Sequence, residues 1–88
     1  MNKEDAINII NKEGLDDRNF FDTTYLAFES TVIEKSNNNW IVYIYGEKGG
    51  KEGLATYNNE SDALIDYIKR LRAEKRIELY YKKRSGSK

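Results

Sequence analysis

The residue types that most often carry out chemistry are few in this sequence of 88 residues, which has neither cysteine nor histidine. Without cysteine there can be no disulfide bond, no thiolate metal site and no cysteine nucleophile. Without histidine the chain lacks the usual general base at neutral pH and the commonest ligand of transition metals. We therefore expect a protein that is not an enzyme and that holds no metal ion and no cofactor.

Carboxylates and glycines are the remaining candidates for a chemical site. Asp16, Asp17 and Asp22 could form a metal or acid–base site, but they lie in a polar stretch after a predicted helix and lack the spacing of a calcium loop. The glycines at 46, 49, 50 and 53 are not followed by Gly-Lys-Ser/Thr, and a strand rather than a helix comes next. The sequence favours solvated charges in the first case and a hairpin turn in the second.

The spacing of apolar residues predicts the elements that position these groups. Helical spacing predicts a short helix over 2–13, and a second helix that begins at a cap formed by Asn58 or Asn59. Alternating patterns predict strands over 25–35, 40–47 and 54–57, joined by turns at 37–39 and 46–53. Residues 77–82 alternate again, so a fourth short strand is an open possibility.

The expected fold class is α+β. The order is α-β-β-β-α, with or without a final strand, and a three- or four-stranded antiparallel sheet carries both helices on one face. We expect one domain over 1–82 and a flexible basic tail over 83–88. No apolar run reaches the length of a membrane span and no signal-peptide pattern is present, so we expect a cytoplasmic protein.

The formal net charge of zero conceals an uneven distribution. Residues 1–34 carry three basic and eight acidic side chains, a net charge of −5, and residues 35–68 carry a net charge of −2. Residues 69–88 carry nine basic and two acidic side chains, a net charge of +7. Such polarity can steer a charged partner, although acids near helix starts and bases near helix ends also have a purely structural benefit.

Two classes of binding partner stay open at this point. Lys82, Lys83 and Arg84 follow two tyrosines, a combination that could contact nucleic acid. Double-stranded RNA-binding domains share the α-β-β-β-α order, but the second helix here starts with Asn-Glu-Ser-Asp, which would repel phosphates. Protein binding is the other class, because exposed tyrosines such as Tyr43 and Tyr45 on the central strand are typical interface anchors. The same rings could also fill a small core.

Three short motifs resemble those of one protein family. They are Trp40-Ile41-Val42-Tyr43, then Gly46-Glu47-Lys48-Gly49, and then Tyr57 followed by Glu60-Ser61-Asp62-Ala63-Leu64. Together they are similar to small immunity proteins of bacterial polymorphic-toxin and contact-dependent growth-inhibition systems, which often show a Trp-x-Val-Tyr strand, a Glu-Arg-Gly turn and a Glu-x-x-Ala helix start. The likeness covers about a third of the chain, and it departs from the family at Lys48, where arginine is expected.

The resemblance implies an inhibitor that binds a toxin domain in the producing cell and blocks its active site or its substrate entry. Toxins of this kind are often nucleases with basic clefts, which Asp16, Asp17, Asp22 and Glu29 could oppose. The other expected contacts are two turn residues and two tyrosines of the central strand: Glu47, Lys48, Tyr43 and Tyr45. Neither a membrane nor a small-molecule substrate is expected as a partner.

Overall fold

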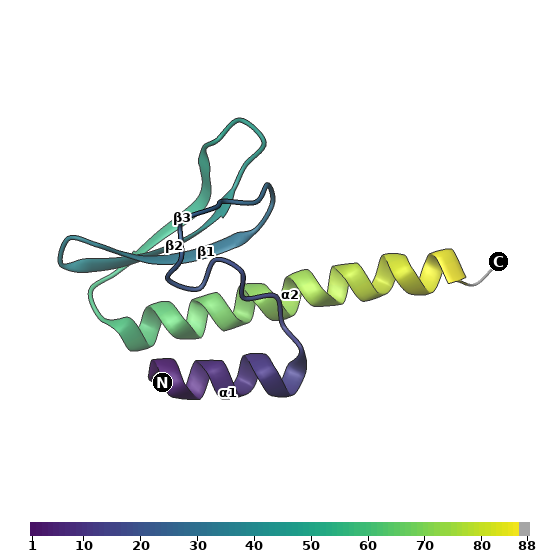
Figure 1. The fold of residues 1–88 in the computed structure, drawn as a ribbon, viewed down its shortest axis with the longest axis horizontal. Helices are drawn as coiled ribbons and strands as arrows, with labels where there is room; N and C mark the ends of the chain where they lie inside the picture. The colour runs from purple at the N-terminus through teal and green to yellow at the C-terminus, as the bar shows by residue number, and fades with distance from the viewer. Residues whose placement is uncertain (87–88) are drawn as a thin grey trace.

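The fold consists of two helices and a three-stranded sheet, as described by a computed structural model that covers residues 1–86 and the side chains as far as Lys82. The elements are α1 (Lys3–Glu13), β1 (Thr31–Ser36), β2 (Asn39–Tyr45), β3 (Lys51–Tyr57) and α2 (Glu60–Gly86) (Figure 1). The strands form an antiparallel sheet in the order β1-β2-β3. The predicted α+β class and the α-β-β-β-α order are confirmed.

Local capping explains where the helices begin and end. The Asn2 side chain accepts a hydrogen bond of 2.8 Å from the backbone N–H of Asp5, whose carboxylate accepts one of 3.2 Å from the backbone N–H of Asn2. Gly14 ends α1 in the left-handed conformation, at φ 63°. Asn59 accepts a hydrogen bond of 2.8 Å from the backbone N–H of Asp62 and thereby caps the start of α2.

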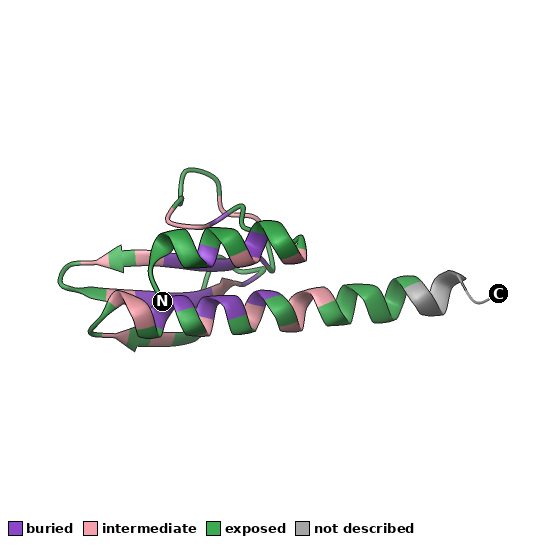
Figure 2. Cartoon of the chain, turned by 90° about the horizontal axis from the view of Figure 1, so that it is seen from below, coloured by how far each residue is buried: buried purple, intermediate pink, exposed green. Residues whose placement is uncertain are grey.

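The core lies between the sheet and α2. Ile33 and Val42 are paired across β1 and β2, and both are fully buried against α2. The buried side of α2 follows the predicted helical spacing and consists of Ala63, Leu64, Tyr67, Ile68 and Leu71. Figure 2 shows that these buried positions occupy only the N-terminal half of α2.

The two helices lie on the same side of the sheet, with α2 directly against the strands and α1 running parallel to α2 (Figures 1 and 2). Ala6 and Ile10 are the buried residues of α1. Two ion pairs connect the parallel helices. Near the helix starts, Nζ of Lys3 lies 4.0 Å from Oε2 of Glu60, and farther along Arg72 binds Glu13. Neither helix of the described residues combines the length and apolar character needed to cross a membrane.

The predicted strand over 25–35 is shorter in the structure and begins at Thr31. Residues 22–30 form an irregular loop instead, and Glu29 within it adopts a left-handed backbone at φ 63°, which interrupts an extended strand. The alternation of Leu26, Phe28 and Val32 therefore did not reflect a continuous strand. The third strand differs in the other direction, because it starts at Lys51 rather than at residue 54.

The possibility of a fourth strand over 77–82 is contradicted by the structure, because α2 continues through this segment to Gly86. Residues 72–76 are Arg-Ala-Glu-Lys-Arg, which are strong helix formers, and extending a helix is easier than starting a new element. The backbone of 83–86 is therefore helical where a tail was expected. Residues 87 and 88 of the predicted tail lie outside the described residues.

Candidate protein-binding surface

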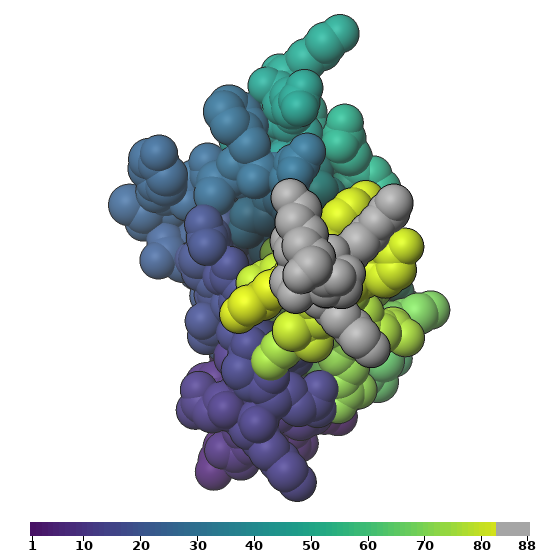
Figure 3. All heavy atoms as spheres, turned by 90° about the vertical axis from the view of Figure 1, so that its right-hand side faces the viewer, coloured from purple at the N-terminus to yellow at the C-terminus, as the bar shows by residue number. Residues whose placement is uncertain are grey.

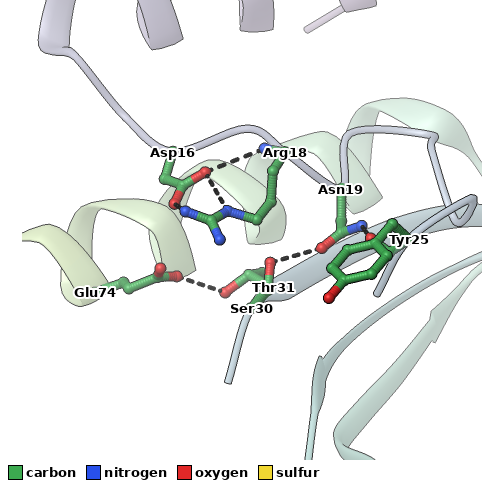
Figure 4. A network of polar contacts seen from close by, with 7 residues as sticks. All are labelled: Asp16, Arg18, Asn19, Tyr25, Ser30, Thr31 and Glu74. Atoms are coloured by element: carbon green, nitrogen blue, oxygen red, sulfur yellow. Dashed lines mark hydrogen bonds and ion pairs between the residues drawn. The ribbon is translucent and has the colours of Figure 1, made fainter. Parts of the chain in front are cut away.

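A buried amide holds the 22–30 loop in place. Asn19 is 0% exposed, and its side-chain nitrogen donates hydrogen bonds of 2.9 Å to the backbone oxygens of Asp22 and Tyr25. Figure 4 shows the bond to Tyr25. Its side-chain oxygen accepts a hydrogen bond of 2.7 Å from the hydroxyl of Ser30. One side chain thus connects the beginning, the middle and the end of the loop.

Backbone hydrogen bonds fix the two ends of the loop to the sheet. Before the loop, the backbone N–H of Phe21 donates to the oxygen of Ile33 at 3.0 Å, so the chain runs beside β1. Near the end of the loop, the backbone N–H of Glu29 donates to the backbone oxygen of Tyr45 at 2.7 Å. Phe21 and Glu29 both have positive φ, a conformation that persists in such residues only where the surroundings enforce it. The loop is therefore held in one defined shape.

The loop directs its apolar side chains to opposite sides. Leu26 packs on the outer sheet face, against a small second core formed by Val32, Ile41 and Tyr43. Tyr25 and Phe28 point to solvent and are 82% and 66% exposed. The ring of Phe28 stacks on that of Tyr45, with centroids 5.7 Å apart and 8° between the ring planes. Exposed aromatic rings on a fixed loop are typical anchors of protein interfaces.

Charged residues surround a groove beside this aromatic pair. The groove has a volume of about 360 Å³, lies between the loop and the β2–β3 hairpin, and is lined by Glu29, Glu47, Lys48, Gly50 and Glu52. In Figure 3 the loop (blue) and the hairpin (teal) lie next to each other on one edge of the molecule. Three carboxylates and one ammonium give the groove a net negative charge, which suits a basic partner.

Four of the predicted contact residues gather at this edge, namely Glu29, Tyr45, Glu47 and Lys48. We refer to these four residues together with Tyr25 and Phe28 as the loop–hairpin surface. The sequence interpretation missed Tyr25 and Phe28, because it placed both in a strand. The polar run Asp22-Thr23-Thr24 before them was the available signal of a loop.

The other three predicted carboxylates are exposed but are not part of the groove. Asp16 forms an ion pair with Arg18 at 2.7 Å, and the hydrogen bond from Arg18 holds the Asp16 pKa below its usual value (Figure 4). Asp22 accepts a hydrogen bond of 3.0 Å from the backbone N–H of Thr24, which lowers its pKa in the same way. Asp17 is exposed in the same connection. Asp16 and Asp22 thus stabilise local turns as well as carrying charge.

Tyr43 was expected to be an exposed contact residue, but the structure buries it. Tyr43 is only 1% exposed, because Leu26 from the loop and Tyr45 pack against the second core on the outer sheet face. Its hydroxyl donates a hydrogen bond of 2.6 Å to Glu34, and burial together with this bond raises the Tyr43 pKa. Tyr43 therefore belongs to the second core.

The basic C-terminal segment is partly neutralised within the chain. Arg72 donates two hydrogen bonds to Glu13, Arg70 pairs with Asp66 at 3.0 Å, and Lys75 binds the backbone oxygens at the end of α1. Lys82 is exposed, whereas the side chains of Lys83 and Arg84 lie outside the described residues. In the described part of the chain no cluster of acidic side chains could hold a metal ion.

Comparisons with protein-family models, with curated proteins and with solved structures found no match to this chain. Its function must therefore be inferred from its own residues.

Proposed function

We propose that this chain is an inhibitor of the immunity type, which binds a bacterial toxin domain and blocks its active site or substrate entry. The observation that carries the proposal is the fixed 22–30 loop, which presents Tyr25 and the stacked pair of Phe28 and Tyr45 beside an acidic groove. The three sequence motifs that resemble immunity proteins give the class of partner.

The aromatic residues supply the affinity in this proposal. In the free chain Asn19 already holds the backbone at Tyr25, and the ring of Phe28 is stacked on Tyr45, so little conformational entropy of the loop is lost on binding. Buried aromatic anchors are commonly worth about 2 kcal/mol or more in an interface. The inhibitor therefore binds mainly through a few ordered rings.

The acidic groove supplies orientation and speed of association. Glu29, Glu47 and Glu52 line one groove and favour a partner surface rich in lysine and arginine. A basic cleft that binds a nucleic-acid substrate has this character. An inhibitor seated over such a cleft would exclude the substrate without any catalytic group of its own.

A binding experiment with a toxin domain encoded by a neighbouring gene tests the proposal. The wild-type chain should bind a catalytically inactive form of the domain and should restore growth of cells that express the active form. Phe28→Ser should weaken binding about 30-fold, which corresponds to the loss of about 2 kcal/mol. Ile65→Ser is the matched control, because Ile65 is an exposed apolar residue on α2 and should leave binding unchanged.

Charge reversal distinguishes the contribution of the groove to binding from that of the aromatic pair. Glu47→Lys should mainly slow association and reduce its dependence on salt, whereas Phe28→Ser should mainly speed dissociation. The proposal is wrong if the wild-type chain neither binds the toxin domain nor protects cells. The assignment of the surface is wrong if both variants bind like the wild type.

A further inference from the structure

The C-terminal part of α2 extends beyond the body of the molecule (Figure 1). We call residues 77–86 the arm. Every residue from Arg76 to Lys82 is exposed. The molecule measures 50 × 32 × 20 Å, and α2 runs along its longest dimension. Figure 3 looks along this direction, so that the described side chains of the arm (yellow) face the viewer. A single helix of this length has little stability of its own in water.

An apolar stripe begins just before the arm, at Ala73, and continues along one side of it. Ala73, Ile77, Tyr80 and Tyr81 follow the spacing i, i+4, i+7 and i+8, which places them together on a helix surface. Ile77 is 58% exposed, and the two tyrosines are exposed to a similar degree. Leu79 is also 51% exposed, but it falls on the opposite side of the helix. The stripe is therefore a continuous apolar surface left open to solvent.

The stripe starts inside a groove of the body. A groove of about 460 Å³ between α2 and the sheet is lined on its apolar side by Ile44, Ala73 and Ile77. Its remaining lining is polar and mostly acidic, and consists of Glu29, Thr31, Glu52, Arg70 and Glu74. The groove thus offers an apolar floor and three carboxylates at the point where the arm leaves the body.

We propose that the arm is a dimerisation element, in which the arms of two copies pair antiparallel around a two-fold axis and each arm ends at the groove of the other copy. Pairing residue 77 of each copy with residue 81 of the other places apolar stripe against apolar stripe. In this register residue 84 lies beside residue 74 of the second copy, which lines the groove.

Charge complementarity identifies a second copy as the occupant. The arm contains the basic run Lys-Lys-Arg at 82–84, and the groove that it would reach carries Glu29, Glu52 and Glu74. The chain supplies both halves of the contact, and its net charge of zero means that two copies do not repel each other overall. Phosphates of a nucleic acid would instead meet these carboxylates and the apolar stripe.

Sedimentation equilibrium of the full chain over a range of concentrations tests this inference without any toxin, so its outcome is independent of the proposed function. The wild-type chain should reach twice the monomer mass as its concentration rises. Ile77→Lys should raise the dimer dissociation constant at least tenfold. Leu79→Lys adds the same charge at similar exposure on the opposite side of the helix and should leave the dissociation constant unchanged.

The remaining tests reverse a charge of the groove and ask whether the arm binds nucleic acid instead of a second copy. Glu52→Lys should weaken the dimer several-fold, and circular dichroism of each variant checks that the helices are retained. A wild-type chain that stays monomeric at all concentrations would overturn the inference, as would equal effects of Ile77→Lys and Leu79→Lys. Salt-dependent binding of a monomer to nucleic acid that Lys82→Glu abolishes would also overturn it, and would assign the arm to nucleic acid.

Discussion

The hydroxyl of Ser30 donates a hydrogen bond of 2.7 Å to the side-chain oxygen of Asn19, and both side chains are buried. Because Asn19 also donates hydrogen bonds to the backbone oxygens of Asp22 and Tyr25, this pair holds the two ends and the middle of the 22–30 loop together. The exposed aromatic residues of the loop–hairpin surface therefore depend on an asparagine that a partner would never touch.

Replacement of Asn19 by alanine should destabilise the fold by roughly 2–3 kcal/mol, because the Ser30 hydroxyl and two backbone oxygens lose their partner. Unfolding in urea measures this change. Asn11→Ala is the control, because Asn11 is exposed on α1 and should change stability by less than about 0.5 kcal/mol. Equal urea midpoints for Asn19→Ala and the wild type would show that the buried amide does not hold the loop.

Patterns of the sequence predicted the elements that form through local interactions. The expected helix over 2–13 corresponds to α1, the expected cap at Asn58 or Asn59 is formed by Asn59, and the apolar spacing of α2 marks its buried side. The 22–30 loop was missed because its shape depends on Asn19 and on the neighbouring strands, which are tertiary contacts. The alternation of Ile77, Leu79 and Tyr81 suggested a strand, but a helix already under way continued through it.

The candidate site was predictable as residue types but not as a cluster. Glu29, Tyr45, Glu47 and Lys48 were expected contacts, yet only the fold shows that they share one edge with Phe28. Tyr43 was misplaced because strand alternation identifies two faces without showing whether a loop covers one of them. Covering by distant segments is the physical reason why exposure is hard to read from a strand pattern.

Tyr67→Phe should raise the free energy of unfolding by about 1 kcal/mol. The Tyr67 hydroxyl is buried without a hydrogen-bond partner among the described residues, and removing it relieves this unfavourable burial. Tyr57→Phe is the matched comparison and should lower the free energy of unfolding by about 1 kcal/mol, because the Tyr57 hydroxyl donates to Asp66 at 2.6 Å. Both changes can be measured by urea unfolding, and a loss of stability in Tyr67→Phe would contradict the expectation.

Gly14→Ala should cost about 1 kcal/mol of stability, because Gly14 ends α1 with a left-handed backbone that alanine adopts unfavourably. An added Cβ would also lie 3.1 Å from Nζ of Lys75, which binds the last backbone oxygens of α1. Gly50→Ala provides the control, since a Cβ there would meet no atom within 4 Å. The comparison requires thermal unfolding of both variants, and an equal effect of the two substitutions would exclude a special role for Gly14.

Glu74 should make stability depend on pH in a defined direction. Partial burial raises the Glu74 pKa above the usual value of 4.5, although the hydrogen bond of 3.0 Å from Thr31 opposes part of this shift. A carboxyl group with a raised pKa binds its proton more tightly in the folded chain, so its ionised form destabilises the fold above that pKa. This destabilisation is present at neutral pH, and it is relieved as the pH falls through the raised pKa towards 4.5 and below.

Glu74→Gln isolates this effect, because glutamine can still accept the hydrogen bond from Thr31 but carries no charge. The variant should be more stable than the wild type at neutral pH, and the difference should shrink as the pH approaches 4. Urea unfolding at fixed protein concentration across this range measures the difference. Glu78→Gln, at an exposed position one turn farther along α2, is the control and should follow the wild type. A stability difference between Glu74→Gln and the wild type that did not change with pH would show that burial of the Glu74 charge is not its cause.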